Sequence, residues 1–348
     1  MAKFLVKRLL TGLAVMWGIV TLLFWLFNLR GSPAASMTDE NTDAATRKAI
    51  ERAHHLDRPL FEQYLWYLND LSPIGWSDRA DGNLLWGWFS DSDDRAFGFK
   101  SPWLRRSFQK DQRVDQLIGE MLPGTALLGA AALLIAISLG IPLGMASAMW
   151  RGKWLDQTIA ILTQLGVSAP SFLVGVILIR LFAVEWGDWT GLRVSGFFRE
   201  EEVFGEGYTY HWRNLFLPAM ALGIRPLAII TQLTRGSLAD VLSSDYIRTA
   251  RAKGLAEHTV VVRHGLKNAL NPVLTSVSGW FASLLAGAFF VETVFDWQGL
   301  GKLTIDALNA NDYPVILGTT LFVGSLFVAT NIIVDFLYTR LDPRIQIQ

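Results

Sequence analysis

The sequence predicts an all-α integral membrane protein with six transmembrane helices, and three observations support this fold class. Hydrophobic residues make up 51% of the 348 residues and charged residues 18%, so the chain is more apolar and less charged than an average soluble domain. Six mostly apolar stretches are each long enough to cross a bilayer, which takes roughly 20 helical residues. Lysine and arginine also gather in alternate short loops, which is typical of the cytoplasmic side of a membrane protein.

The predicted spans are helices because a backbone surrounded by lipid must satisfy its polar groups internally. Their approximate bounds are Leu9–Leu29, Thr125–Trp150, Leu155–Ala183, Leu215–Leu233, Val273–Val291 and Val315–Leu337. The first stretch could instead be a signal peptide, since Lys3, Lys7 and Arg8 precede it. Its apolar part is too long for one, so a membrane helix is predicted.

The charges in the loops predict the orientation of the chain. Six spans place both termini on one side, and that side holds Lys3, Lys7, Arg8, Arg151, Lys153, Arg235, Arg340 and Arg344. This side is therefore predicted to be cytoplasmic. The chain then divides into a first helix over residues 1–30, an outer region over 31–121, and a five-helix core over 122–348 that includes a cytoplasmic loop at 234–272.

The outer region, between the first two spans, is predicted to be partly helical. From Thr42 the pattern favours two short helices, and the second begins at Pro59, a residue suited to the first turn of a helix. Helical spacing places four apolar residues of this second helix on one stripe, namely Phe61, Tyr64, Leu65 and Leu68. Such a stripe requires a partner surface.

A stretch rich in Gly, Asp and Ser follows and is predicted to be irregular: "SPIGWSDRADGNLLWGWFSDSDDRAFGFKSPW". It contains Trp76, Trp86, Trp88 and Trp103. Tryptophan favours the membrane interface, so these residues could form a belt on lipid headgroups or on neighbouring spans. The alternative is a docking surface for a soluble partner.

The cytoplasmic loop contains the stretch "DYIRTARAKGLAEHTVVVRHGLKNALNP", which begins at Asp245. Ser243 or Ser244 can cap the start of a helix there, and Asp245 in the first turn complements the helix dipole. Judged by charge alone, the cations of this stretch indicate no more than a cytoplasmic location.

Ile247, Ala250 and Gly254 fall on one face of this predicted helix, where small residues allow another surface to approach closely. Gly254 can also adopt backbone angles that strain other residues. It is therefore predicted to form the corner into a second helix, from about Glu257 to Leu270.

The order of residues in this loop carries a more specific signal. "DYIRTARAKGL" followed by "LKNALNP" resembles the cytoplasmic signature loop of binding-protein-dependent ABC importer permeases, specifically the B-type subunit of dipeptide and oligopeptide systems. The resemblance implies a short coupling helix seated in a cleft of an ATPase subunit. By position, Gly254 matches the glycine at its turn and Ala250 the second alanine of a Glu-Ala-Ala signature, while Arg248 and Thr249 replace the first two residues. The implied coupling residues are Asp245, Tyr246, Ile247, Arg248, Ala250, Arg251, Lys253, Gly254 and Leu255.

The resemblance covers nearly the whole chain, including "HHLDRPLFEQYLWYL", "EMLPGTALLG", "SAPSFLVGVILI", "LYTRLDPRI" and "VETVFDWQGLGKLTIDALNANDYPVILG". The last of these resembles the family's outer turn between the final two spans. The resemblance implies that this turn faces a solute-binding protein or an outer gate, through Glu292, Asp296, Gly299 and Gly301. Two features depart from the family, since Gln298 stands where a proline is common and the tryptophan-rich stretch looks like an insertion.

Two positions within the spans are candidates for the transport pathway. Arg225 lies near the middle of the fourth span, where an ionisable group is costly and usually faces protein or water. It could pair with the carboxylate of a peptide, or with internal partners such as carbonyls freed by Pro226. Pro170 should bend the third span, with Ser168 and Ser171 able to satisfy the freed backbone. The bend could be a gate or could only shape the helix.

Several function classes find no support in the sequence. No GxxxxGK motif followed by Ser or Thr occurs, so the chain cannot hydrolyse ATP by the P-loop route. The absence of cysteine excludes disulfides and thiolate metal sites, and the histidines show no metal-binding spacing. No nucleophile motif appears, and a net charge of zero gives no reason to expect nucleic acid as a partner.

The resemblance implies that the chain is half of the membrane channel of an ATP-driven importer in the bacterial inner membrane, working by alternating access. The implied substrate is a peptide or a similar small solute. The implied partners are the lipid bilayer, a C-type permease in a heterodimer, two ATPase subunits that hold ATP and Mg²⁺, and a periplasmic solute-binding protein. No cofactor bound by this chain itself is expected.

Two other functions remain as alternatives. A secondary transporter or channel driven by an ion gradient predicts buried acidic residues within spans, of which the predicted spans contain almost none. A structural membrane anchor with an outer interaction domain would leave Arg225 and the signature-like loop unexplained.

Overall fold

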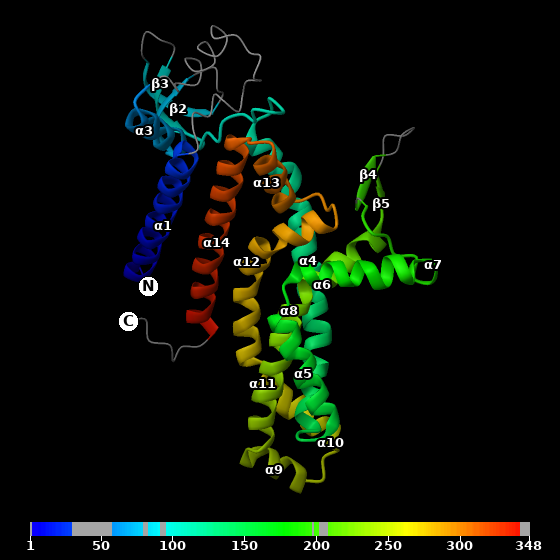
Figure 1. Ribbon diagram of the computed structural model, residues 1–348. Helices are drawn as coiled ribbons and strands as arrows, with labels where there is room; N and C mark the ends of the chain where they lie inside the picture. Colours follow the sequence, from blue (N-terminus) through cyan, green and yellow to red (C-terminus); the bar gives the residue numbers. More distant parts are fainter. Residues whose placement is uncertain are drawn as a thin grey trace. The chain divides into compact units, whose positions relative to one another are not determined.

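The computed structural model describes residues 2–29, 58–78, 83–90, 95–196, 198–201 and 208–341. The chain forms two compact units, Met1–Glu120 with Leu303–Ser325 and Met121–Lys302 with Leu326–Gln348, and both are mostly helical (Figure 1). The helix predicted from Thr42 and the cation Arg344 lie outside the described residues.

Four of the described helices are long and apolar enough to cross a membrane. They are α1 (Ala2–Leu29), α4 (Val114–Met149), α8 (Trp212–Leu242) and α14 (Tyr313–Leu341). A bent pair would make a fifth span, formed by α5 (Trp154–Ser168) and by α6 (Ser171–Leu178) with the π-helix η3 (Ile179–Glu185). The fifth predicted span falls on α12 (Asn271–Val294). Every predicted span therefore coincides with helix, while length and hydropathy support four or five spans.

Pro170 breaks the third predicted span, as expected for a residue that lacks a backbone N–H. α5 and α6 differ in direction by 112° across the break. Ala169 N–H donates to Leu165 O (2.9 Å) and Val174 N–H donates to Pro170 O (3.1 Å), so the backbone there bonds locally. No side-chain hydrogen bond caps the described start of α6, so the help predicted from Ser171 is not seen.

In the first unit, α3 (Leu60–Leu71) packs on α1 through a face that differs from the predicted stripe. Tyr64 and Tyr67 are buried with Val20 and Phe24 of α1, and the Tyr64 hydroxyl lies 2.7 Å from the Thr21 hydroxyl oxygen. Two residues of the predicted stripe, Phe61 and Leu65, are exposed instead. The helix and its start at Pro59 are confirmed, and half of its stripe is wrong because the buried face is centred one position away.

The tryptophan-rich stretch is a three-stranded antiparallel sheet, so the prediction of an irregular chain and of an all-α protein is wrong here. Its strands are β1 (Ile74–Asp78), β2 (Leu84–Ser90) and β3 (Arg95–Lys100), in the order β1-β3-β2. Gly75, Gly98 and Gly87 lie opposite one another across the three strands. A Cβ on Gly98 would lie 1.8 Å from Trp86 O, so this glycine permits a close approach of strands and does not mark a loop.

In the second unit, α8 packs against α4, α5, α6 and α12. Before α8 the chain forms the short helix α7 (Gly187–Thr190) and a two-stranded antiparallel sheet of β4 (Arg199–Glu201) and β5 (Tyr208–Tyr210). The core cluster includes Leu128, Leu222, Val291, Phe295 and Trp297. α4 approaches α8 closely at Gly144, where a Cβ would lie 2.6 Å from Thr234 Cβ. The outer turn leads from α12 into α13 (Leu300–Asn309).

Candidate functional site

The candidate site is a bent helical segment that follows α8. Ser244 is the N-cap residue of α9 (Asp245–Ala252), and Asp245 lies in the first turn as predicted. The Ser244 hydroxyl donates to Val241 O (2.6 Å), so its side chain does not cap α9. Gly254 follows α9 with φ of 75°, in the left-handed region that glycine adopts without strain. The predicted corner at Gly254 is therefore confirmed.

One side of the helix α9 packs against this chain and is called its inner side, and the opposite, exposed side is called its outer side. Ile247 is completely buried, and with Ala250 it packs against Val260 and the end of α8. Two residues of the predicted face, Ile247 and Ala250, are thus covered by this chain itself and are not available to another protein, whereas the third, Gly254, is exposed. The residues on the outer side are exposed, namely Asp245, Tyr246, Arg248, Arg251, Lys253, Gly254 and Leu255.

The second predicted helix runs through three consecutive helical elements, α10 (Glu257–Thr259), the π-helix η4 (Val260–Leu266) and α11 (Lys267–Ala269). Val261 and Gly265 of η4 are buried. A Cβ on Gly265 would lie 3.1 Å from Leu238 Cδ1, so η4 packs closely on the end of α8. Short π-helical turns within helices are frequent at functional sites.

Two polar contacts also hold α9 in place. The Tyr246 hydroxyl accepts a hydrogen bond from Asn268 Nδ2 (2.9 Å), which ties α9 to the region around α11. Arg251 pairs with Glu257 across the Gly254 corner, with Nε and Nη2 at 3.1 and 2.6 Å from the two carboxylate oxygens. These hydrogen bonds raise the pKa of Arg251 and lower the pKa of Glu257. These contacts hold α9 in a fixed orientation relative to α10 and α11.

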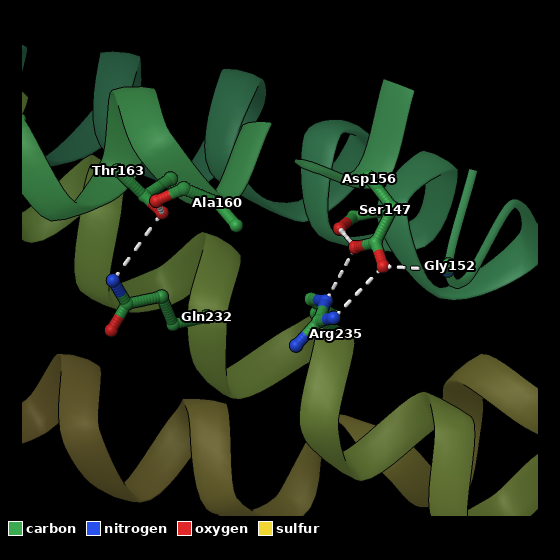
Figure 2. Close-up of polar contacts among 7 residues, drawn as sticks. All are labelled: Ser147, Gly152, Asp156, Ala160, Thr163, Gln232 and Arg235. Carbon is green, nitrogen blue, oxygen red and sulfur yellow. Dashed lines mark hydrogen bonds and ion pairs between the residues drawn. The ribbon is translucent and has the colours of Figure 1, made fainter. Parts of the chain in front are cut away.

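A buried ion pair connects α8 to the corner between α4 and α5 (Figure 2). Asp156 is 3% exposed, and its two oxygens lie 2.6 and 2.9 Å from Arg235 Nε and Nη2. The Ser147 hydroxyl also donates to Asp156, as does the Gly152 N–H (2.8 Å). One turn away, Gln232 Nε2 of α8 donates to the Thr163 hydroxyl of α5 (3.3 Å). The start of α5 is thus fixed to the helix that carries α9.

Sequence reasoning missed this ion pair. It counted Arg235 only among the cytoplasmic cations and gave Asp156 no role. The available signal was a single carboxylate at the start of an apolar helix, which requires a partner when buried.

Arg225, the pathway candidate, is exposed on α8 in the single chain, whereas Leu222, Pro226 and Ala228 beside it are buried. Its side chain thus lies on the side of α8 that this chain leaves uncovered.

At the outer turn, Glu292 is completely buried. It accepts hydrogen bonds from the Thr125 hydroxyl (2.7 Å) and from the backbone N–H groups of Gly301 (2.7 Å) and Lys302 (3.1 Å). A Cβ on Gly301 would lie 2.4 Å from Phe289 Cα, so the turn closes tightly around this carboxylate. Glu292 therefore stabilises the turn from inside through hydrogen bonds and does not lie on its exposed surface.

Asp296 is half-buried in the turn; it has φ of 54° and pairs with Lys302 Nζ (2.6 Å). Gly299 packs against the Glu292 carboxylate. A Cβ added to Gly124 would lie 1.9 Å from the backbone carbonyl oxygen of Gln298, the residue that stands where the family commonly has proline. The turn thus contacts the start of the second predicted span. Within the described residues, no group of three or more His, Cys, Asp or Glu could hold a metal ion.

Residues 140–347 match the family described as "Binding-protein-dependent transport system inner membrane component", and residues 1–83 match the N-terminal region of such membrane components. The chain belongs to this family. It is an inner-membrane permease subunit of a binding-protein-dependent ABC importer, which implies a solute-binding protein and an ATPase as partners.

Full-length relatives agree with this assignment. The dipeptide transport system permease protein DppB of Bacillus subtilis is 33% identical over 100% of this chain and 99% of the relative. The glutathione transport system permease protein GsiC of Escherichia coli K12 is 34% identical over 99% of each chain. A structure of the MetNI methionine ABC transporter in an inward-facing conformation matches with a TM-score of 0.51 and 16% identity, over 66% of this chain and 97% of the other. That likeness concerns the fold alone.

The alternative of an ion-driven transporter is not favoured. It predicted buried acidic residues, and Asp156 and Glu292 are buried within helices. Both carboxylates, however, accept several hydrogen bonds from this chain, so each is used in holding the fold together.

Proposed function

We propose that this chain is one of two channel-forming subunits in an ATP-driven importer of short peptides or peptide-like solutes. The dipeptide and glutathione permeases that it resembles support this substrate class. In this proposal six helices cross the membrane, both termini are cytoplasmic, and region 31–121 is periplasmic. A C-type permease completes the channel as a heterodimer. Two ATPase subunits bind and hydrolyse ATP with Mg²⁺, and this chain supplies no ATPase site.

The observation that carries the proposal is the two-sided construction of α9. Ile247 and Ala250 fix its inner side to this chain, while Arg248 and Leu255 on the outer side are exposed. A helix supported in this way transmits displacement, because closely packed interiors are nearly incompressible. We therefore assign the exposed side, with the corner at Gly254, to the cleft of the ATPase subunit.

The contacts behind α9 define a path for the motion. Val260 and Gly265 join the coupling segment to the end of α8. Arg235 of α8 holds Asp156 at the start of α5. When ATP binding displaces α9, α8 and the corner between α4 and α5 move with it, and the spans reorient around the solute.

Two further features fit a pathway between the paired permeases. A charge within a span rarely faces lipid, so Arg225 is assigned to the cavity or to the partner permease, where it can pair with the carboxylate of a peptide. The break at Pro170 and Ser171 leaves irregular backbone within an apolar region. Such backbone is tolerated only beside protein or water, which supports a gate there. Asp296, whose side chain is 51% exposed in the outer turn, is assigned to contact with the binding protein.

The proposal is tested by exchanging Gly254 for valine and, as a matched control, for asparagine. No atom lies within 4 Å of a Cβ at this position, so the change acts through backbone strain, which asparagine tolerates better than a branched residue. The transporter is reconstituted in proteoliposomes with its ATPases and binding protein. Gly254→Val is expected to abolish ATP-driven uptake while basal ATP hydrolysis continues, and Gly254→Asn is expected to retain most uptake. Unchanged uptake in Gly254→Val would contradict the proposal.

A further inference from the structure

The three-stranded sheet presents an aromatic face that is largely exposed among the described residues. Strand alternation places Ile74 and Trp76 of β1, Trp86 of β2, and Phe97 and Phe99 of β3 on this face. Trp86 is 68% exposed. Edge-on ring contacts fix the arrangement, with centroids 5.5 Å apart for Trp76 and Phe97 and 5.0 Å apart for Trp88 and Phe99. The face is therefore an ordered apolar surface.

The opposite face of the sheet is already bound to α3. Asn69 donates to Trp76 O (2.8 Å) and accepts from Trp76 N–H (2.9 Å), and Lys100 Nζ donates to the same carbonyl (2.7 Å). Small residues line that face, since a Cβ on Gly75 would lie 2.3 Å from Asn69 Oδ1. The sheet thus cannot turn its aromatic side inward without losing these contacts.

The helix that carries the sheet is packed on the end of a candidate membrane span. The apolar span within α1 is Val6–Leu26, and Tyr64 and Tyr67 of α3 pack on Val20 and Phe24, within its last two turns. Figure 1 draws α3 and the sheet at the end of α1 that is farthest from the N-terminus. With α1 crossing the bilayer over this span, the packing places α3 near the depth where hydrocarbon gives way to headgroups, a layer roughly 5–8 Å thick on each side, and the sheet is bound to α3.

Continuity with the exposed apolar surface of α1, a candidate membrane span, indicates what covers the aromatic face. Trp25 and Leu26 are exposed at the end of α1, and Phe61 and Leu65 are exposed on α3. The aromatic face bears only two charged residues, Asp78 and Arg95, opposite each other at one end of the described strands. Tryptophan is the residue best suited to a headgroup layer, because its ring is apolar and its N–H can bond to water or lipid.

We propose that the aromatic face lies in the headgroup layer of the bilayer at the C-terminal end of α1 and anchors the first unit to the membrane surface. The occupant is the lipid of the same membrane that α1 crosses. The anchor holds α3 and the sheet at a fixed depth. This inference does not depend on the coupling role of α9.

The natural absence of cysteine permits a direct test by site-directed spin labelling. Single variants Trp86→Cys and Ile74→Cys, at two edges of the aromatic face, are labelled in the complete transporter in proteoliposomes. Lys110→Cys, at an exposed polar position of the same unit, is the control. Power saturation compares the accessibility of each label to oxygen, which concentrates in lipid, and to a nickel chelate, which stays in water. Retained uptake verifies the fold of each variant.

Oxygen is expected to relax the labels at 86 and 74 more than nickel does, with the reverse order at 110. The binding protein is expected to leave this difference unchanged. Nickel access at both aromatic-face labels, with or without the binding protein, would overturn the proposal. So would labels that are open to nickel until loaded binding protein is added and are then shielded, because the face would then be a protein docking surface.

Discussion

Two buried carboxylates of the second unit are satisfied in opposite ways. Asp156 is paired with a cation, Arg235, that lies 79 residues away in the sequence. Glu292 is held by neutral donors, a threonine hydroxyl and two backbone N–H groups of the turn that follows it. The first arrangement joins separate helices through charge, and the second closes a turn and also bonds it to α4 through Thr125. The difference predicts that the charge of Asp156 depends on one cation, whereas Glu292 depends on the conformation of its turn and on the Thr125 hydroxyl.

Arg235→Ala is expected to cause the largest loss of stability. Breaking a buried pair costs about 3–5 kcal/mol, and because the Arg235 side chain is 37% exposed, solvent screening places this change at about 3 kcal/mol or below. The free energy of unfolding of the purified chain in detergent measures the loss.

The double variant Asp156→Asn/Arg235→Met is the matched control for this prediction. It removes both charges, so it is expected to recover more than half of the loss. An Arg235→Ala protein as stable as the parent would mean that the pair does not hold α5 to α8.

Glu292→Gln is expected to have an intermediate effect. Glutamine keeps one acceptor oxygen but turns an amide N–H₂ toward a group that donates, either the Thr125 hydroxyl or the Gly301 N–H. A buried donor left without an acceptor costs about 1–3 kcal/mol. The same unfolding measurement ranks it against Arg235→Ala. A larger loss in Glu292→Gln would reverse the comparison and make the turn the more critical of the two sites.

Glu257→Gln is expected to have the smallest effect, because the pair with Arg251 is 42% and 54% exposed and exposed pairs contribute about 1 kcal/mol or less. The lowered pKa of Glu257 gives the sign of its pH dependence. Its contribution is present above the unfolded pKa and is lost as pH falls through the folded value. Stability measured between pH 7 and pH 3 should fall slightly less in Glu257→Gln than in the parent. A steeper fall in the variant would contradict this sign.

Local signals in the sequence predicted the elements that depend on local chemistry. Apolar length placed the spans on helices, and Pro170 marked the break between α5 and α6. The corner at Gly254 was predicted because it follows from the backbone preference of a single residue, whereas the side-chain cap expected from Ser243 or Ser244 is not formed.

The rest depended on contacts between distant segments. The sheet was missed because Gly75, Gly87 and Gly98 look like loop glycines until they are aligned across three strands. The burial of Ile247 and Ala250 against this chain was missed because the spacing that suits an external partner also suits α8 and Val260. No local pattern connects Asp156 with Arg235.

The central claim, that motion of the ATPase enters through the exposed side of α9, is tested most directly by cross-linking. Because the chain has no cysteine, Arg248→Cys and Lys253→Cys each create a single attachment point on that side. Phe61→Cys, an exposed position on α3, is the control. In the assembled transporter, a short bifunctional reagent is predicted to join positions 248 and 253 to the ATPase subunit, and ATP is predicted to alter the yield. Cross-linking to the ATPase from position 61 but from neither position on α9 would contradict the account.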